Sequence, residues 1–373
     1  MTPNIEAYSA GRGARVYRLP MEVFPGLVGY AHLLLDDGFA ALVDCGSGFG
    51  DSDAQLEAGM HAVREQHGEV VDWADLTHVL ITHAHIDHFG GLRFVRERSS
   101  AAVGVHELDL RVLTHYEKRL EVVDRRMAEF LSEAGLASDE EHSLLDLYRL
   151  HKHLFASVEV DFTYQANGMR IGPLNVIHVP GHCPGHVVFR WEDFLLAGDH
   201  VLMGVSPHLA PERLSLNTGL GHYLESLGRV RALAPSLRLT LPGHGPVIED
   251  LAGRVEAIED LHAARLNRIL DFTAAPRTLA EISRELFPQA SGYHGLLAIE
   301  EAGAHVEFLS ERGYLGTDRP GGLPPHAPRY ARLDPSHPPL PDVGAWRARP
   351  SADAARLPDE AGPSRRRRTV ADL

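Results

Sequence analysis

The chain has 373 residues, of which 44% are hydrophobic and 23% charged, a composition typical of a folded protein with one large domain and a smaller one. Its formal net charge of −15 disfavours nucleic-acid phosphates and anionic membrane surfaces as the main partners. The sequence has no apolar run of about 18 residues and no basic stretch leading into an apolar one near Met1, so we expect neither a membrane span nor a secretory signal.

The first hundred residues alternate between apolar runs and turn residues, which is typical of short strands. We predict strands over residues 15–19, 30–35, 39–43, 77–81 and 101–105. Asp36-Asp37-Gly38 is a hairpin signal between the second and the third of these strands. Apolar residues at helical spacing predict a helix over residues 52–67.

Longer helical periodicity begins near residue 107 and lasts to about 155, which predicts a helical insertion. Strands resume over residues 158–163, 174–179, 187–191, 194–197 and 237–241. Helices are predicted over residues 217–233, 253–272, 278–288 and 294–312. Proline becomes frequent from Pro320 onward, and the apolar periodicity stops there.

Three histidines and one aspartate lie within six residues, directly after the predicted strand at 77–81. A packed core has no use for so much polarity, because buried imidazole and carboxylate groups cost free energy unless they are paired or bind an ion. A solvated, histidine-rich loop is the plain alternative, but such loops do not usually follow a buried strand. The pattern therefore predicts metal ligands at His83, His85, Asp87 and His88.

Four further strand ends carry a polar residue flanked by glycine or proline, which permit a sharp turn and a close approach to a ligand. These residues are Asp44, His182, Asp199 and His244. Side chains at strand ends can converge on one edge of a sheet. Together the strand ends offer five imidazoles and two carboxylates besides Asp44, which is too many ligands for one ion and about right for two ions that share a carboxylate. Mixed nitrogen and oxygen ligands suit zinc, and also iron or manganese.

The stretch His83-Ala84-His85-Ile86-Asp87-His88 is similar to the H-x-H-x-D-H signature of the metallo-β-lactamase fold superfamily, and the other strand ends follow in that superfamily's order. The resemblance covers roughly residues 15–250. It implies an α+β fold, a four-layer αββα sandwich in which two sheets pack face to face with helices outside.

The resemblance also implies a role for each residue at the strand ends. The implied ligands are His83, His85 and His182 for the first metal, Asp87, His88 and His244 for the second, and Asp199 as a bridge between them. Asp44 would support the histidine-rich turn by hydrogen bonds rather than bind metal. The aspartate at position 199 resembles the hydrolase branches of glyoxalase II and lactonase type.

Several residues near the motifs have plainer expected roles. Relatives often carry threonine where Cys183 stands, and we interpret this cysteine as a small buried residue rather than a reactive or metal-binding thiol. His186 and His200 adjoin the ligands and are interpreted as residues that support the ligands from behind or that pack in the core. Three more histidines are candidates for lining a substrate pocket: His208, His222 and His294.

We predict three parts along the chain. These are residues 1–250 as the metallo-β-lactamase-fold catalytic domain with its insertion at about 107–155, residues 251–318 as a small winged-helix-like domain, and residues 319–373 as a proline-rich, disordered tail. Residues 251–320 hold seven arginines and no lysine against eleven acidic residues, the wrong sign for a phosphate-binding surface. We expect this part to cover the core and to narrow the active-site cleft. The four arginines at 365–368 are expected to lie in solvent.

The favoured function is a dinuclear metal-dependent hydrolase with two divalent ions, zinc ahead of iron or manganese. A metal-bound hydroxide would attack the carbonyl of a thioester, lactone or ester, and Asp87 would be the catalytic residue that holds the attacking water. The expected partner is a small-molecule or acyl-thioester substrate, with no nucleic acid and no membrane, and a homodimer is left open. Because Cys45 and Cys183 are too few for a disulfide framework, we expect a cytoplasmic protein.

Three other functions are compatible with parts of this pattern. A metal-dependent ribonuclease would use the same metal geometry on a phosphodiester, but the acidic composition disfavours it. An iron oxygenase or redox protein on this fold is disfavoured by the full set of seven ligands. The intact ligand set likewise disfavours a non-enzymatic scaffold or regulator.

Overall fold

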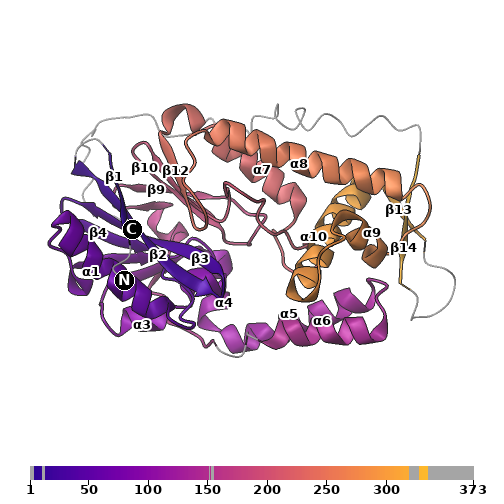
Figure 1. The fold of residues 1–373 in the computed structure, drawn as a ribbon, viewed down its shortest axis with the longest axis horizontal. Coiled ribbons are helices and arrows are strands. Elements are labelled where there is room, and N and C mark those ends of the chain that lie inside the picture. Colours follow the sequence, from indigo (N-terminus) through magenta and orange to yellow (C-terminus); the bar gives the residue numbers. More distant parts are fainter. Residues whose placement is uncertain (1–3, 11–12, 151, 153–154, 319–326, 335–373) are drawn as a thin grey trace, which may run out of the picture.

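Two β-sheets lie face to face in the computed structural model, which describes residues 4–10, 13–150, 152, 155–318 and 327–334 (Figure 1). Helices cover the outer face of each sheet, and further helices extend away from the sheets. Within the described ranges, every helix is too short or too polar to span a bilayer.

The first sheet has seven strands in chain order, so each strand is hydrogen-bonded to the next one along the chain. They are β1 (Glu6–Ser9), β2 (Arg15–Phe24), β3 (Leu27–Asp36), β4 (Phe39–Val43), β5 (His78–Leu80), β6 (Ala102–Val105) and β7 (Phe162–Thr163). Pairing is antiparallel from β1 to β4 and parallel from β4 to β7. Side chains alternate between the two faces, so Val16 and Leu34 face the second sheet, whereas Leu19 and Leu33 face the outer helices.

The second sheet has five strands in the order β12-β11-β10-β9-β8. They are β8 (Arg170–Ile171), β9 (Leu174–His178), β10 (Val187–Trp191), β11 (Phe194–Gly198) and β12 (Leu239–Pro242). Only the pair β11–β12 is parallel among the described strand pairs of this sheet. Trp191, Phe194 and Leu241 pack against residues of the first sheet and form the core between the two sheets.

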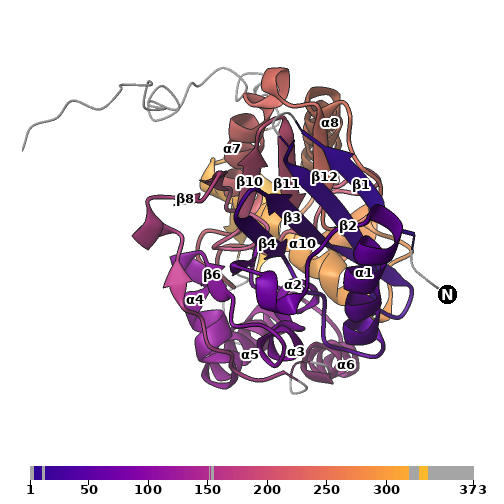
Figure 2. The same cartoon turned by 90° about the vertical axis from the view of Figure 1, so that its left-hand side faces the viewer.

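Helices lie on both sides of the paired sheets, with α7 and α8 on one side and α2 and α3 on the other (Figure 2). The α-helices are α1 (Ser52–His67), α2 (Ile86–Phe89), α3 (Leu92–Arg96), α4 (Glu107–Thr114), α5 (Tyr116–Ser132), α6 (Ser138–Leu150), α7 (Leu220–Arg231), α8 (Leu251–Phe272), α9 (Leu279–Leu286) and α10 (Gly292–Glu311). Short 3₁₀ turns span Trp73–Asp75, Gln165–Asn167 and Ala234–Ser236. Separate buried clusters fill the two helix-to-sheet layers. The predicted α+β sandwich is thus confirmed.

The strands that were predicted to end in polar residues do so at one edge of the sandwich. The pairs β4–β5 and β11–β12 each run parallel, so their carboxyl ends point the same way within each sheet. The chain turns sharply after β4 and at the end of β11, where Asp44 and Gly198 have φ angles of 60° and 49°. Aspartate tolerates this left-handed conformation better than most residues, and glycine tolerates it freely.

The predicted insertion at 107–155 is helical over α4, α5 and α6. The chain bends at His115, which divides the helical periodicity between two helices, with Leu113 buried on α4 and Met127 and Phe130 buried on α5. Helix α6 packs against both α5 and α10. The insertion therefore connects the first sheet with the C-terminal helices.

The C-terminal part contains α8, α9 and α10 and a two-stranded antiparallel sheet of β13 (Leu315–Asp318) and β14 (Arg329–Arg332). A capping box between Thr278 and Glu281 begins α9, near the start of the helix predicted over 278–288. Helices α8 to α10 share one buried cluster with α7 and the second sheet. Whether this part is a winged-helix module stays a prediction.

The prediction of an unstructured tail from residue 319 is wrong for residues 329–332, which form β14. Backbone hydrogen bonds pair this strand with β13, a separate bridge joins Tyr330 to Arg277, and Tyr330 packs against the C-terminal core, so a single aromatic residue replaces the apolar periodicity that the sequence would reveal. The remainder of the predicted tail, at 319–326 and 335–373, lies outside the described residues.

A long hairpin of β2 and β3 reaches well beyond the predicted strands at 15–19 and 30–35. Its tip is the turn at Pro25-Gly26, where Gly26 has a φ angle of 80°. Pro20 and Gly29 interrupt the apolar pattern, so the sequence pattern predicted only the inner half of the hairpin. This outer half reaches the strand ends, because Gly29 bridges His244.

Candidate metal centre

The structure brings all seven predicted ligands together at the strand ends, in two groups. Within each group, one potential ligand atom per residue lies within 4.8 Å of the others. The first group is His83, His85 and His182, and the second is Asp87, His88, Asp199 and His244. Five of these residues lie in loops that follow strands, and Asp87 and His88 lie on the short helix α2 after β5, so the sheets and this helix fix where the side chains meet.

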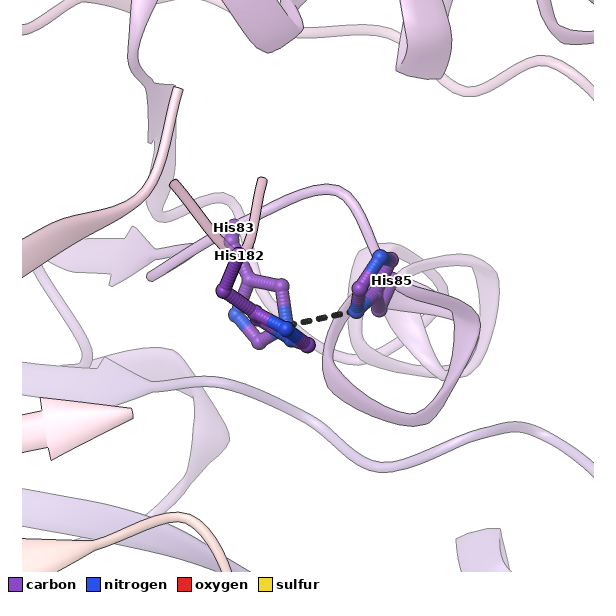
Figure 3. Close-up of side chains that lie close together, drawn as sticks. All are labelled: His83, His85 and His182. Carbon is purple, nitrogen blue, oxygen red and sulfur yellow. Dashed lines mark hydrogen bonds between the residues drawn. The ribbon is translucent and has the colours of Figure 1, made fainter. Parts of the chain in front are cut away.

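The three imidazoles of the first group come from two neighbouring loops (Figure 3). Nε2 of His83 lies 3.0 Å from Nδ1 of His85, and the rings of His85 and His182 stand edge to face with centroids 4.5 Å apart. Burial and the adjacent imidazoles lower the pKa of each, that of His85 to about 3. Neutral imidazoles keep a lone pair available, which is the form that binds a metal ion.

The second group pairs imidazoles with carboxylates. Nε2 of His244 lies 3.2 Å from Oδ2 of Asp87. Burial alone would raise the pKa of Asp87, but the neighbouring imidazoles outweigh burial and hold this pKa at about 2. Burial opposes a charge on His88, yet three carboxylates around it raise its pKa well above 6.5. The same negative field would favour a divalent cation.

Asp199 reaches both groups of ligands. Its Oδ1 lies 3.3 Å from Nε2 of His88, and its Oδ2 lies 3.9 Å from Nε2 of His182 and 3.7 Å from Nε2 of His244. Burial would raise the pKa of Asp199, but the imidazoles outweigh burial and keep it well below its ordinary range. One ionised carboxylate therefore lies between two clusters of nitrogen donors, as a bridging ligand would.

Asp44 supports the histidine-rich turn, as predicted. Its Oδ1 accepts a hydrogen bond from the backbone N–H of Thr82, and its Oδ2 accepts from the Thr82 hydroxyl and from Nδ1 of His88, each at 2.8 Å. The Thr82 oxygen in turn lies 3.0 Å from Nδ1 of His83. A carboxylate can only accept, so both histidines carry a proton on Nδ1 and direct Nε2 toward the site, where a bound cation would replace any proton on that nitrogen.

Two further imidazoles are oriented by backbone carbonyls. Nδ1 of His182 donates to the carbonyl of His208 over 2.6 Å, and Nδ1 of His244 donates to the carbonyl of Val28 over 2.8 Å. Hydrogen bonds on the outer nitrogen are usual for histidines that bind metal, because they fix the tautomer and the ring. These acceptors were not predicted, since any residue type can supply a backbone carbonyl.

The inner atoms of the two groups fit divalent ions. Nε2 of His88, Nε2 of His182 and Oδ1 of Asp199 are buried, yet none has hydrogen-bond geometry with another described residue. Leaving such atoms unpaired costs free energy, which a bound cation would offset. Three nitrogens in one group, and two nitrogens with two carboxylates in the other, form a donor set suited to zinc, iron or manganese.

Asp109 is a structural residue of the site that the sequence analysis missed. This buried carboxylate accepts hydrogen bonds from the backbone N–H of Ala84 and of Gly185 and from Sγ of Cys183. It therefore ties the His83–His88 turn to the loop of His182, and burial raises its pKa to about 6. The only sequence signal is an acidic residue among apolar ones in the first turn of α4.

The other histidines and cysteines near the motifs occupy different surroundings. Cys183 is buried, as predicted. His186 stacks on His83 with centroids 4.5 Å apart and accepts from the backbone N–H of Asp199, while His200 is fully buried beside it. The three pocket candidates diverge: His208 lies beside His182, His222 lines a surface cavity with Glu212, and His294 is exposed at the start of α10.

Glycine is required where the strand-end loops touch. A Cβ atom on Gly243 would lie 2.7 Å from Oδ1 of Asp199 and from Cε1 of His88, so a side chain there would push apart two predicted ligands. A Cβ atom on Gly90 would lie 2.1 Å from the carbonyl oxygen of Ser47. The close approach of these loops thus explains glycines that follow the motif residues.

Comparison with known proteins identifies related chains. The Beta-lactamase-like protein 2 homolog of Drosophila melanogaster is 26% identical over 200 residues, which are 53% of this chain and 55% of that protein. This match thus spans about half the length of the Drosophila relative. Hydroxyacylglutathione hydrolase of Anaeromyxobacter dehalogenans is 29% identical over 269 residues, 67% of this chain and 77% of that protein.

Two solved structures share the fold over most of the chain. A metallo-beta-lactamase family protein from Thermus thermophilus has a TM-score of 0.67 at 27% identity, covering 85% of this chain and 98% of that chain. A beta-lactamase domain protein from Burkholderia ambifaria has a TM-score of 0.66 at 25% identity, covering 88% and 95%. Residues 25–264, which contain both ligand groups, match the family profile of the metallo-beta-lactamase superfamily. The chain therefore belongs to the metallo-beta-lactamase superfamily.

Proposed function

We propose that this protein is a dinuclear metal-dependent hydrolase that acts on the carbonyl of a thioester, lactone or ester. The observation that carries the proposal is the position of Asp199, whose two oxygens lie within 3.9 Å of imidazoles from both ligand groups. A single ion would leave one of these groups of buried donors without a partner.

The proposed ligands are His83, His85 and His182 for the first ion, Asp87, His88 and His244 for the second, and Asp199 for both. When bound, the two ions would supply a nucleophile at neutral pH and polarise the bond under attack. We propose zinc as the metal, because imidazole nitrogens outnumber carboxylates in the donor set, and iron and manganese fit the same donors.

Asp87 is the proposed catalytic residue. Its carboxylate is partly exposed, lies 3.2 Å from Nε2 of His244 and is ionised at neutral pH. An ionised carboxylate at the edge of the site can accept a hydrogen bond from the attacking water and orient it toward the carbonyl. Hydrogen bonds on Nδ1 already orient four of the five imidazoles, which supports a preorganised site.

The proposed substrates are small molecules, including acyl thioesters. One relative is named hydroxyacylglutathione hydrolase. We propose that this chain also catalyses hydrolysis, but we do not propose the same substrate. The net charge of −15 supports a substrate other than RNA.

Two free, buried cysteines, Cys45 and Cys183, support a cytoplasmic location. We further propose that residues 251–318 act as a cover for the catalytic part rather than as a nucleic-acid reader.

The test combines metal analysis with hydrolysis assays on thioesters, lactones, esters and single-stranded RNA. We expect two metal ions per wild-type chain, and a fall of about 100-fold or more in hydrolysis for Asp87→Ala and His182→Ala, with less bound metal. His222→Ala is the matched control, because His222 lies in a separate surface cavity. Full hydrolysis by metal-stripped protein would contradict the proposal, and cleavage of RNA alone would favour the ribonuclease alternative.

A further inference from the structure

A second group of histidines lies among the C-terminal helices, apart from the two ligand groups. His262 on α8 and Glu301 and His305 on α10 are buried, with exposed fractions of 0%, 6% and 0%. One donor atom from each lies within 4.8 Å of the others, so the residue types alone are compatible with a metal ion. We call these three residues the C-terminal cluster.

The hydrogen bonds of the C-terminal cluster argue against a metal ion. Both carboxylate oxygens of Glu301 are engaged, Oε2 by the backbone N–H of Leu209 over 2.7 Å and Oε1 by Nη1 of Arg265 over 2.8 Å. Nδ1 of His305 donates to the carbonyl of Glu301 over 2.7 Å. Because Arg265 already neutralises the carboxylate, an added divalent ion would bring an uncompensated buried charge.

The cluster forms a directed chain of hydrogen bonds. A carbonyl only accepts, so His305 carries its proton on Nδ1 and its Nε2 accepts from Nδ1 of His262 over 3.0 Å. Nε2 of His262 must then accept from the hydroxyl of Ser206 over 2.9 Å, a shorter contact than the 3.3 Å from that hydroxyl to the carbonyl of Pro207. Burial lowers the pKa of both imidazoles, which keeps them in the neutral form that this chain of bonds requires.

The chain of bonds ends on the loop that leads from β11 to α7. Ser206 is held by the cluster at one end, and Leu209 is held at the other end by Glu301. Between these two anchors lies His208, whose carbonyl accepts the proton of His182 Nδ1 over 2.6 Å. The cluster therefore fixes the acceptor that orients a proposed metal ligand.

We propose that the C-terminal cluster is a positioning element for His182: it clamps residues 206–209 so that the His208 carbonyl sets the tautomer and the orientation of the His182 ring. The inference rests on the proposed function for the statement that His182 binds a metal ion. Loss of the clamp frees the carbonyl, and His182 then samples other ring orientations. Weakening such an outer hydrogen bond typically lowers metal affinity by about 10- to 100-fold.

The test compares His262→Leu with Glu307→Gln in the otherwise intact chain. Leucine fills part of the imidazole volume but breaks the chain of bonds to Ser206. Glu307 is on α10, as are Glu301 and His305. Its carboxylate accepts hydrogen bonds from the backbone N–H groups of Glu212 and Arg213, which lie farther along the loop between β11 and α7. The control therefore loosens the loop without touching the clamp. If His262→Leu does not fold, Ser206→Ala takes its place in the test, because it removes only one half-buried hydroxyl from the same chain of bonds.

The first readout is the tautomer of His182 in metal-free protein, observed by ¹⁵N NMR of the imidazole. We expect a single Nδ1–H form in the wild type and in Glu307→Gln, and a mixture of forms in His262→Leu. This readout needs no bound metal and no activity, so it separates failure of the clamp from failure of the proposed function. An unchanged His182 spectrum in a folded His262→Leu variant would overturn the proposal.

The second readout is zinc affinity, measured by competition with a chromophoric chelator. We expect His262→Leu to weaken one of two zinc sites by about 10- to 100-fold and Glu307→Gln to leave both sites unchanged. The double variant His262→Leu/His182→Ala should bind zinc as His182→Ala does, because the cluster acts through His182. Equal losses of zinc affinity in His262→Leu and Glu307→Gln would overturn the positioning role. So would a His262→Leu protein that binds one zinc ion fewer per chain than the wild type.

Discussion

Replacing Asp44 by asparagine removes one charge and one acceptor at the base of the proposed site. Asparagine tolerates the left-handed φ of 60° at this position, so the backbone need not move. Its carbonyl oxygen can still accept from the Thr82 N–H, but its amide N–H₂ then meets the N–H of His88 Nδ1. Two buried donors that face each other cost about 1–3 kcal/mol.

A neutral His88, the form that binds metal, can escape this conflict only by carrying its single proton on Nε2. That nitrogen lies 3.3 Å from Oδ1 of Asp199 and is a proposed metal-binding atom, so the proton would block the second site. We therefore expect Asp44→Asn to weaken one zinc site by about 10- to 100-fold, which corresponds to about 1.4–2.7 kcal/mol. The first site loses less, because Asp44 reaches His83 only through Thr82.

Zinc competition with a chromophoric chelator measures both affinities, and urea denaturation of metal-free protein measures the change in stability. Asp51→Asn is the matched control, because it makes the same chemical change at an exposed residue just before α1. An Asp44→Asn protein that binds two zinc ions with wild-type affinity would refute the proposed tautomer control.

Three further outcomes follow from the structure. Gly90→Ala should destabilise the protein by about 1–3 kcal/mol in urea denaturation, because its Cβ would lie 2.1 Å from the carbonyl oxygen of Ser47; an unchanged midpoint would contradict that close contact. Burial lowers the pKa of His305 from 6.5 in the unfolded chain to about 3 in the folded protein, so protonation of this imidazole below pH 6.5 favours unfolding. At pH 5 the resulting loss in the free energy of unfolding is about 2 kcal/mol relative to a pH above 6.5. His305→Leu should reduce the pH dependence of the free energy of unfolding by that amount. Removing metal with a chelator should lower the melting temperature in calorimetry, since an ion at about a hundred times its Kd stabilises the folded chain by about 2.7 kcal/mol per site; identical melting curves would argue against bound ions.

The strand ends and the candidate ligands were predictable from residue types, and the resemblance to a known family added the sandwich. Apolar runs of strand length, each followed by a histidine or aspartate next to glycine or proline, predict both a buried strand and a functional turn. The order of these turns along the chain matched a known family signature. His83, His182 and His244 therefore come together although they are separated by up to about 160 residues.

The features that were not predictable act through backbone atoms, or lie in segments whose sequence pattern indicates a different role. Val28 and His208 orient imidazoles with their carbonyl oxygens, which every residue possesses. Asp109 lies in an ordinary amphipathic helix, and its role appears only when two loops meet it. The strand at 329–332 forms by backbone pairing within a proline-rich stretch, where composition predicts disorder.

The two-ion centre is tested most directly by X-ray diffraction from zinc-grown crystals, recorded on both sides of the zinc absorption edge. We predict two anomalous peaks, each within one ligand group and both in contact with the Asp199 carboxylate. The expected ligands are His83, His85 and His182 for one peak and Asp87, His88 and His244 for the other. A single peak, or a strong peak away from these groups such as at His262, would contradict the dinuclear site.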